Sequence, residues 1–166
     1  KLAHKYVYAL NHSGSVLAWK YFHSNTKTPT LLKYIEDIDI WKLALSNTRE
    51  LFASLDTYKL NFVLWNKIAR DWESPHSRKK YLEEGRAILK YQNYLVGKAI
   101  ENAEEVRFLG ERALAVNFAL NLNSEIGDEM RKKGFPLGII WQKRWDKIVV
   151  SLRSTNKVDS SKIAAR

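Results

Sequence analysis

The spacing of apolar side chains in the first part of the chain predicts a series of short amphipathic helices. The segments "SGSVLAWKYF", "TPTLLKYIEDIDIW", "TRELFASL" and "NFVLWNKIARDW" repeat apolar residues every three or four positions, which places them on one helical face. Ser13 is the expected N-cap of the first helix, and Pro29 fits the first turn of the second. Asn47, followed by Glu50 three residues later, matches a capping box for the third.

A longer helical pattern follows Pro75, which breaks the chain. It begins at Ser77 and continues to about Ala103, with apolar positions on one side and charged residues on the other. We therefore expect a helix of at least 20 residues in this stretch.

The last third of the chain changes to short, strand-like segments. "EVRFLGERALAVNFAL" predicts two strands joined by a hairpin turn near Gly110. "NSEIGDEMRKKG" predicts a helix that begins at Asn123 or Ser124 and ends at Gly134. "PLGIIWQKRWDKIVVSLRS" predicts two more strands with a turn near Lys143.

These elements together predict an α+β fold. A helical part over residues 1–105, with a long connecting helix, should precede a small α+β domain over residues 106–166 with a mixed or mostly antiparallel sheet of about four strands. Residues 1–10 are expected to form a short strand or a sheet edge. The chain has 166 residues and no cysteine, which excludes a disulfide framework and a thiolate metal site.

The net charge of the chain favours anionic partners. Lys and Arg number 28 against 18 acidic residues, a net charge of +10. Such an excess attracts phosphates and nucleic acid, although many soluble domains are basic for solubility alone. No apolar run reaches the roughly 18 residues of a spanning helix, and no signal peptide is visible. We expect no membrane partner and an intracellular location, in the cytoplasm or an organellar matrix.

Four segments in order carry a resemblance to a known family: "LNHSGSVLAWKYF", "LLKYIEDIDIW", "LAVNFALNLNSEIGDEM" and "VVSLRSTNKVDSSKIAAR". Together they resemble the DHH-family phosphoesterases, from the end of the catalytic domain into the DHH-associated C-terminal domain. The family's Asp-His-His motif and its terminal glycine-rich GGGH loop do not occur in this sequence. The resemblance implies a metal-dependent phosphoesterase with Mn or Mg in the complete protein, and an incomplete and inactive portion in this chain.

Asp37 and Asp39 are the candidate metal ligands, because carboxylate oxygens suit Mn and Mg. The resemblance matches Asp37 to the family's remaining metal ligand in this segment. The alternative is an acidic helix end held by hydrogen bonds. Too few ligands are present to identify catalytic residues or to require a metal in this chain alone.

Arg153 is the candidate for substrate phosphate, with Ser151 and Ser154 as further donors. A guanidinium offers a fork of donors that matches phosphate oxygens, and the resemblance assigns this segment to phosphate contact. The alternative makes Ser154 and Asp159 helix or turn caps and pairs Arg153 with an acid.

Three further residues are weaker candidates. Ser13 and Gly14 at a helix start would present amides to an anion, or form a plain capped turn. Trp41 could stack on a nucleobase, or belong to the core. Two functions remain open: part of a DHH-like phosphoesterase acting on a nucleotide or other phosphoester, or a catalytically dead basic remnant that binds RNA or protein in a larger assembly.

Overall fold

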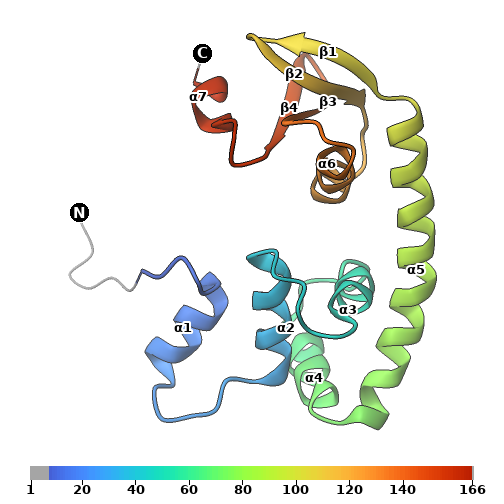
Figure 1. Cartoon of the computed structure of the whole chain (residues 1–166). Helices are drawn as coiled ribbons and strands as arrows, with labels where there is room; N and C mark the ends of the chain where they lie inside the picture. Colours follow the sequence, from blue (N-terminus) through green and yellow to red (C-terminus); the bar gives the residue numbers. More distant parts are fainter. Residues whose placement is uncertain (1–7, 166) are drawn as a thin grey trace. The chain divides into compact units, whose positions relative to one another are not determined.

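The computed structural model describes residues 8–165, so most of the strand or edge expected over residues 1–10 lies outside the described part. The chain is α+β, with helices preceding a four-stranded sheet (Figure 1). It divides into two compact units, residues 1–90 and 91–166. Within residues 8–90 the first unit contains four helices and the start of a fifth: α1 (Gly14–Phe22), α2 (Thr30–Asp39), α3 (Thr48–Leu55), α4 (Phe62–Trp72) and α5 (Pro75–Glu101).

The helix starts of the first unit confirm one predicted cap and correct another. Ser13 caps α1, because its side chain accepts a hydrogen bond from the N–H of Val16. Pro29 lies at the N-cap of α2, one position before the first turn. The capping box predicted for Asn47 is wrong: its φ of 66° is left-handed, and its side chain makes no capping bond.

A core of large side chains holds the first unit together. Its buried members come from α2, α3, α4 and the early turns of α5, and are Leu31, Leu51, Leu55, Ile68, Trp72 and Tyr81. Gly85 lets α5 approach α3 closely, because a Cβ at this position would overlap the backbone carbonyl of Glu50. The unit is therefore a packed helical body in which α3 and α5 nearly touch.

The long helix is confirmed, since α5 runs for 27 residues. Pro75 is its first residue, which suits a proline because the first-turn N–H groups have no partner inside the helix. The last turns of α5 belong to the second unit, where Val96 and Ala99 enter the core beside the sheet.

The second unit is built on a mixed sheet, as predicted. Its strands lie in the order β1-β2-β3-β4, with antiparallel outer pairs and a parallel central pair, β2 with β3. The parallel pair needs a crossover, and α6 supplies it. The elements are β1 (Glu104–Phe108), β2 (Glu111–Asn117), α6 (Asn123–Lys132), β3 (Leu137–Arg144), β4 (Lys147–Ser154) and α7 (Ser160–Ala164).

The two hairpins turn tightly. Leu109 and Gly110 both have positive φ, of 49° and 90°, as a two-residue type I′ turn requires. The second turn begins at Trp145, φ 53°, so the turn predicted near Lys143 comes two residues later. Lys143 instead pairs with Ile148 in the ladder.

Helix α6 ends as expected but begins without a side-chain cap. Its first residue is Asn123, and the cap position is Leu122, which makes no side-chain capping bond. Gly134 has a φ of 85°, and its N–H bonds back to the carbonyl of Arg131. A glycine tolerates this left-handed conformation, which ends the helix.

Helices cover both faces of the sheet. One face, with Leu114, Val116 and Ile140, packs against α6 and the end of α5. The other face, with Ala113, Leu137 and Ile139, packs against Val158 and Ile163 at the C-terminal turn and α7. Alternate residues of each strand therefore enter different cores. No helix in residues 8–165 has the length and apolar character needed to cross a membrane.

Candidate phosphate-binding sites

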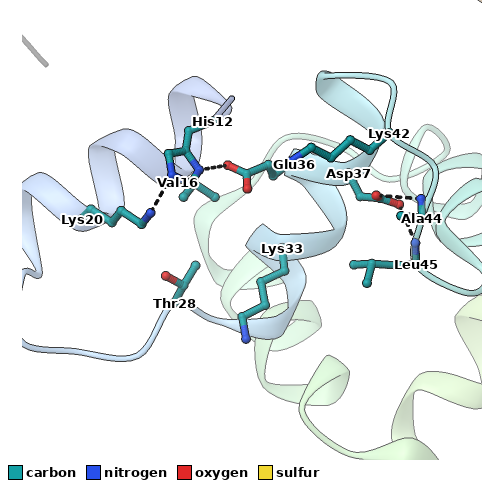
Figure 2. Close-up of a pocket in the computed structure, with 10 residues that line it drawn as sticks. All are labelled: His12, Val16, Lys20, Thr28, Lys33, Glu36, Asp37, Lys42, Ala44 and Leu45. Carbon is teal, nitrogen blue, oxygen red and sulfur yellow. Dashed lines mark hydrogen bonds and ion pairs between the residues drawn. The ribbon is translucent and has the colours of Figure 1, made fainter. Parts of the chain in front are cut away.

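A pocket of about 400 Å³ opens in the first unit beside α1 and α2 (Figure 2). Its lining mixes cationic, acidic and small side chains, namely His12, Val16, Lys20, Thr28, Lys33, Glu36, Asp37, Lys42, Ala44 and Leu45. Its volume lies in the usual range of small-molecule pockets. The pocket gathers two of the predicted segments, the start of α1 and the acidic end of α2.

Glu36 occupies the anion position predicted at the start of α1. Its Oε2 accepts the backbone N–H of Ser13 at 2.9 Å and lies 3.0 Å from Nδ1 of His12. Burial alone would raise the pKa of Glu36, but the bonds from Ser13 and His12 and the nearby charge of Lys42 outweigh it and lower the pKa. The anion that accepts the N–H of Ser13 is therefore the carboxylate of Glu36 and not an external ligand.

His12 links Glu36 to Lys20. Nε2 of His12 lies 3.0 Å from the ammonium of Lys20. An ammonium can only donate, so Nε2 accepts, and the ring proton lies on Nδ1, which donates to Glu36. The bond from Lys20 to His12 therefore brings no negative charge to the ammonium group.

Asp37 holds the loop that follows α2. Its Oδ1 accepts the N–H of Ala44 at 2.9 Å, and its Oδ2 accepts the N–H of Leu45 at 3.1 Å and the hydroxyl of Thr48 at 2.6 Å. Its backbone carbonyl accepts two further amides, those of Lys42 and Leu43.

The same loop contains three non-glycine residues with positive φ, Trp41, Leu43 and Asn47, a conformation that costs an L-residue roughly 1–2 kcal/mol. Burial would raise the pKa of Asp37, yet the bonds from Thr48, Ala44 and Leu45 lower it. Asp37 thus stabilises this strained loop as a charged carboxylate.

The predicted pair of metal ligands does not converge. Asp39 is exposed and lies two residues from Asp37 on α2, which turns it about 200° away around the helix. Among residues 8–165 no group of three or more His, Cys, Asp or Glu side chains is placed to hold a metal ion. The residues present do not fit the metal pair that the family resemblance implies.

Trp41 is not a bare stacking surface. The guanidinium of Arg49 lies 5.9 Å from the centre of its ring, within the range of a cation–π contact. Trp41 is half-buried in the strained loop after α2. Its ring is therefore already engaged on the face that Arg49 covers.

Arg153 lies in the second unit against α6. Its side chain crosses Gly127, where a Cβ would overlap its aliphatic part. One guanidinium nitrogen donates to the carbonyl of Leu152 at 3.2 Å, and another donates to the hydroxyl of Ser124 at 3.4 Å. In the part of the chain that the structure describes, no carboxylate pairs with Arg153. The alternative of an acid partner therefore finds no support within these residues.

The structure brings Ser151 and Arg153 together but separates Ser154 from them. Alternate residues of a strand point to opposite faces, so Ser151 and Arg153 share the α6 face and Ser154 lies on the other. Asp159 caps α7, accepting the N–H groups of Ser161 and Lys162. The capping role weighed for Asp159 is thus confirmed.

Sequence reasoning missed four residues that these two sites contain. Lys20, Lys33 and Lys42 line the pocket, and Ser124 contacts Arg153. The spacing of Lys33 from Glu36 and Asp37, three and four positions, already places all three on one helical face. No comparable sequence signal brings Ser124 to Arg153, because that contact depends on the β4–α6 packing.

Comparison with known proteins identifies no family. No family model and no solved structure matches the chain. It is similar to the uncharacterized protein R106 of Acanthamoeba polyphaga mimivirus, with 27% identity over 169 residues that cover 96% of this chain and 39% of that protein. The chain spans about two fifths of the length of this curated relative.

Proposed function

We propose that this chain is the phosphate-recognising portion of a DHH-like phosphoesterase that acts on a nucleotide or another phosphoester. The observation that carries the proposal is the guanidinium of Arg153, held beside Ser124 in the first turn of α6 with no carboxylate partner among the described residues. The family resemblance of the "SLRS" segment assigns the same residue to substrate phosphate.

The electrostatics of this position favour an anion. The first turn of α6 has no side-chain cap, and a helix N-terminus carries partial positive charge. Arg153 adds a full positive charge at the same end, where Glu125 is the acidic residue of the first turn. Its two recorded bonds use two of the five guanidinium N–H groups. A phosphate would accept remaining guanidinium donors in a bidentate geometry.

Hydrolysis would need groups that these residues do not assemble. Within residues 8–165 no three potential ligands converge on a metal position, so we assign binding and orientation of the phosphate to this chain and no chemical step. Ser151, on the same face as Arg153, is the second residue that we place beside the phosphate.

The second candidate is a basic accessory subunit that binds RNA without hydrolysing it. The net charge of +10 favours it, since phosphate neutralisation drives non-specific nucleic-acid binding. It differs from the first candidate in needing no defined phosphate position.

A nuclear magnetic resonance titration with a nucleoside monophosphate tests the proposal. We expect saturable shifts in the amides of Ser124 and Glu125 and in the side-chain Nε–H of Arg153. Shifts that spread over lysine-rich surfaces and never saturate would favour the accessory-subunit alternative. A lack of change at α6 would contradict the first candidate, and a lack of change anywhere in the chain with both a nucleotide and a short RNA would contradict both.

A further inference from the structure

The cationic side chains of the first-unit pocket exceed its acidic ones. Lys20, Lys33 and Lys42 line it together with only two carboxylates, Glu36 and Asp37. No salt bridge within residues 8–165 joins any of these three lysines to a carboxylate. A cluster of like charges around a hollow attracts an ion of opposite sign.

The two carboxylates are committed to the protein. Asp37 is buried, with its oxygens directed at the loop of residues 44–48. Glu36 faces the N–H of Ser13 and the ring of His12. Figure 2 shows Lys42 extending beside Glu36, and its charge lowers the pKa of both carboxylates. Lys42 therefore offsets one of the two negative charges in the pocket, and the three lysines against two carboxylates leave it with an excess of one positive charge.

Lys20 and Lys33 form no salt bridge with either pocket carboxylate, although the charge of Lys33 adds to the hydrogen bonds from Thr30 that lower the pKa of the Glu73 carboxyl. Among the described residues the ammonium of Lys20 bonds only to the ring of His12, and the ammonium of Lys33 makes no hydrogen bond, since only the backbone N–H of Lys33 donates, to the carbonyl of Pro29. The half-buried Thr28 lies on the same side of the pocket in Figure 2 and adds a hydroxyl. Two ammonium groups and a hydroxyl are the donors that a phosphate monoester accepts.

We propose that this pocket binds the phosphate group of a small phosphorylated molecule through Lys20, Lys33 and Thr28. The pocket, at about 400 Å³, exceeds the size of a phosphate ion and leaves room for the group that the phosphate carries. The site lies wholly in the first unit, and it rests neither on Arg153 nor on the proposed function.

A titration with inorganic phosphate at constant ionic strength tests the site, with a nucleoside monophosphate and an oligonucleotide lacking terminal phosphates as parallel probes. We expect saturable shifts in the amides of Thr28 and Lys33 with the first two probes. Sodium chloride at matched ionic strength should not reproduce them. Shifts that do not saturate, or that chloride reproduces, would overturn the proposal, as would binding of the oligonucleotide alone.

Variants locate the binding within the chain. Lys33→Ala and Lys20→Ala should each weaken phosphate binding about tenfold, the order expected for a charged hydrogen bond. Both lysines are exposed, so an unchanged amide spectrum without ligand will show that each variant folds. Lys59→Ala, an exposed lysine outside the pocket, is the matched control and should bind as the parent does.

Arg153→Ala separates this site from the proposed function. It should leave the shifts at Thr28 and Lys33 intact. Phosphate shifts confined to Ser124 and Glu125 would overturn the pocket proposal while supporting the role of Arg153. Equal affinity in Lys33→Ala and Lys59→Ala would also overturn it.

Discussion

The carboxylate of Glu36 accepts the backbone N–H of Ser13 at 2.9 Å, so α1 begins against an anion that the protein itself supplies. The side chain of Ser13 meanwhile accepts the N–H of Val16. The sequence predicted an anion site at the start of α1, but Glu36 and the side chain of Ser13 already accept the N–H groups of Ser13 and Val16 there. What remains open is the cationic side of the neighbouring pocket, formed by Lys20 and Lys33.

Replacing Asp37 tests whether its carboxylate is structural. The two carboxylate oxygens of Asp37 together accept three hydrogen bonds. Asp37→Asn replaces one of these oxygens with an NH2 group, which would face N–H or O–H donors that it cannot accept. We expect a loss of about 2–4 kcal/mol in the free energy of unfolding, measured by urea denaturation, as for a broken buried charged network. The control Asp39→Asn, at an exposed position, should change it by less than about 0.5 kcal/mol. Similar values for the two variants would contradict the structural role of Asp37.

Stability should fall in acid because of Glu36 and Asp37. Their pKa values lie below the ordinary 4.5 and 3.8, since hydrogen bonds and Lys42 outweigh the effect of burial. A carboxylate with a lowered folded pKa contributes its full stabilisation above its unfolded pKa and loses it as pH falls through the folded value. Melting temperature should therefore show no loss from these groups between pH 7 and 5, and should fall below about pH 4.5. The double variant Glu36→Gln, Asp37→Asn should show a shallower acid decline, and an equally steep one would exclude these two groups as its cause.

Two glycines of α5 should respond oppositely to alanine. A Cβ at Gly85 would overlap the backbone carbonyl of Glu50, and backbone cannot move aside as a flexible side chain can. Gly85→Ala should therefore lower the free energy of unfolding by about 1–3 kcal/mol. At Gly97 a Cβ meets nothing within 4 Å, so Gly97→Ala should stabilise the helix by about 0.5–1 kcal/mol. Thermal unfolding of both variants checks this pair, and destabilisation by Gly97→Ala would contradict it.

The sequence predicted elements better than it predicted contacts. Apolar spacing is a local signal, and it located the long helix and the four strands, including the exit of β4 at Ser154. The capping box at Asn47 failed because the network around Asp37 holds the preceding loop in a left-handed conformation, a tertiary effect that no local motif encodes. Arg153 was identified from its residue type, but its neighbour Ser124, 29 positions away, depends on packing across Gly127.

Hydrolysis should be absent from this chain alone. We expect no turnover of a short oligonucleotide or a generic phosphodiester above the buffer rate with Mn²⁺ added, because within residues 8–165 no three metal-binding side chains converge. Product release followed by chromatography measures this. Robust turnover that Asp37→Asn abolishes, in a variant shown to remain folded, would contradict the assignment of binding alone.

The most direct measurement of the phosphate role of Arg153 is the dissociation constant of a nucleoside monophosphate for Arg153→Ala, read from the amide shifts of Ser124 and Glu125, with the melting temperature of the variant measured beside it. Arg107→Ala, an exposed arginine of β1 in the same unit, is the matched control. Phosphate recognition by Arg153 predicts affinity weakened by roughly 1–3 kcal/mol, or about 5- to 150-fold, in a variant that still unfolds cooperatively above the assay temperature. The control should keep the parent affinity. An unchanged dissociation constant together with a lowered melting temperature would contradict the phosphate role and leave Arg153 as a packing residue over Gly127.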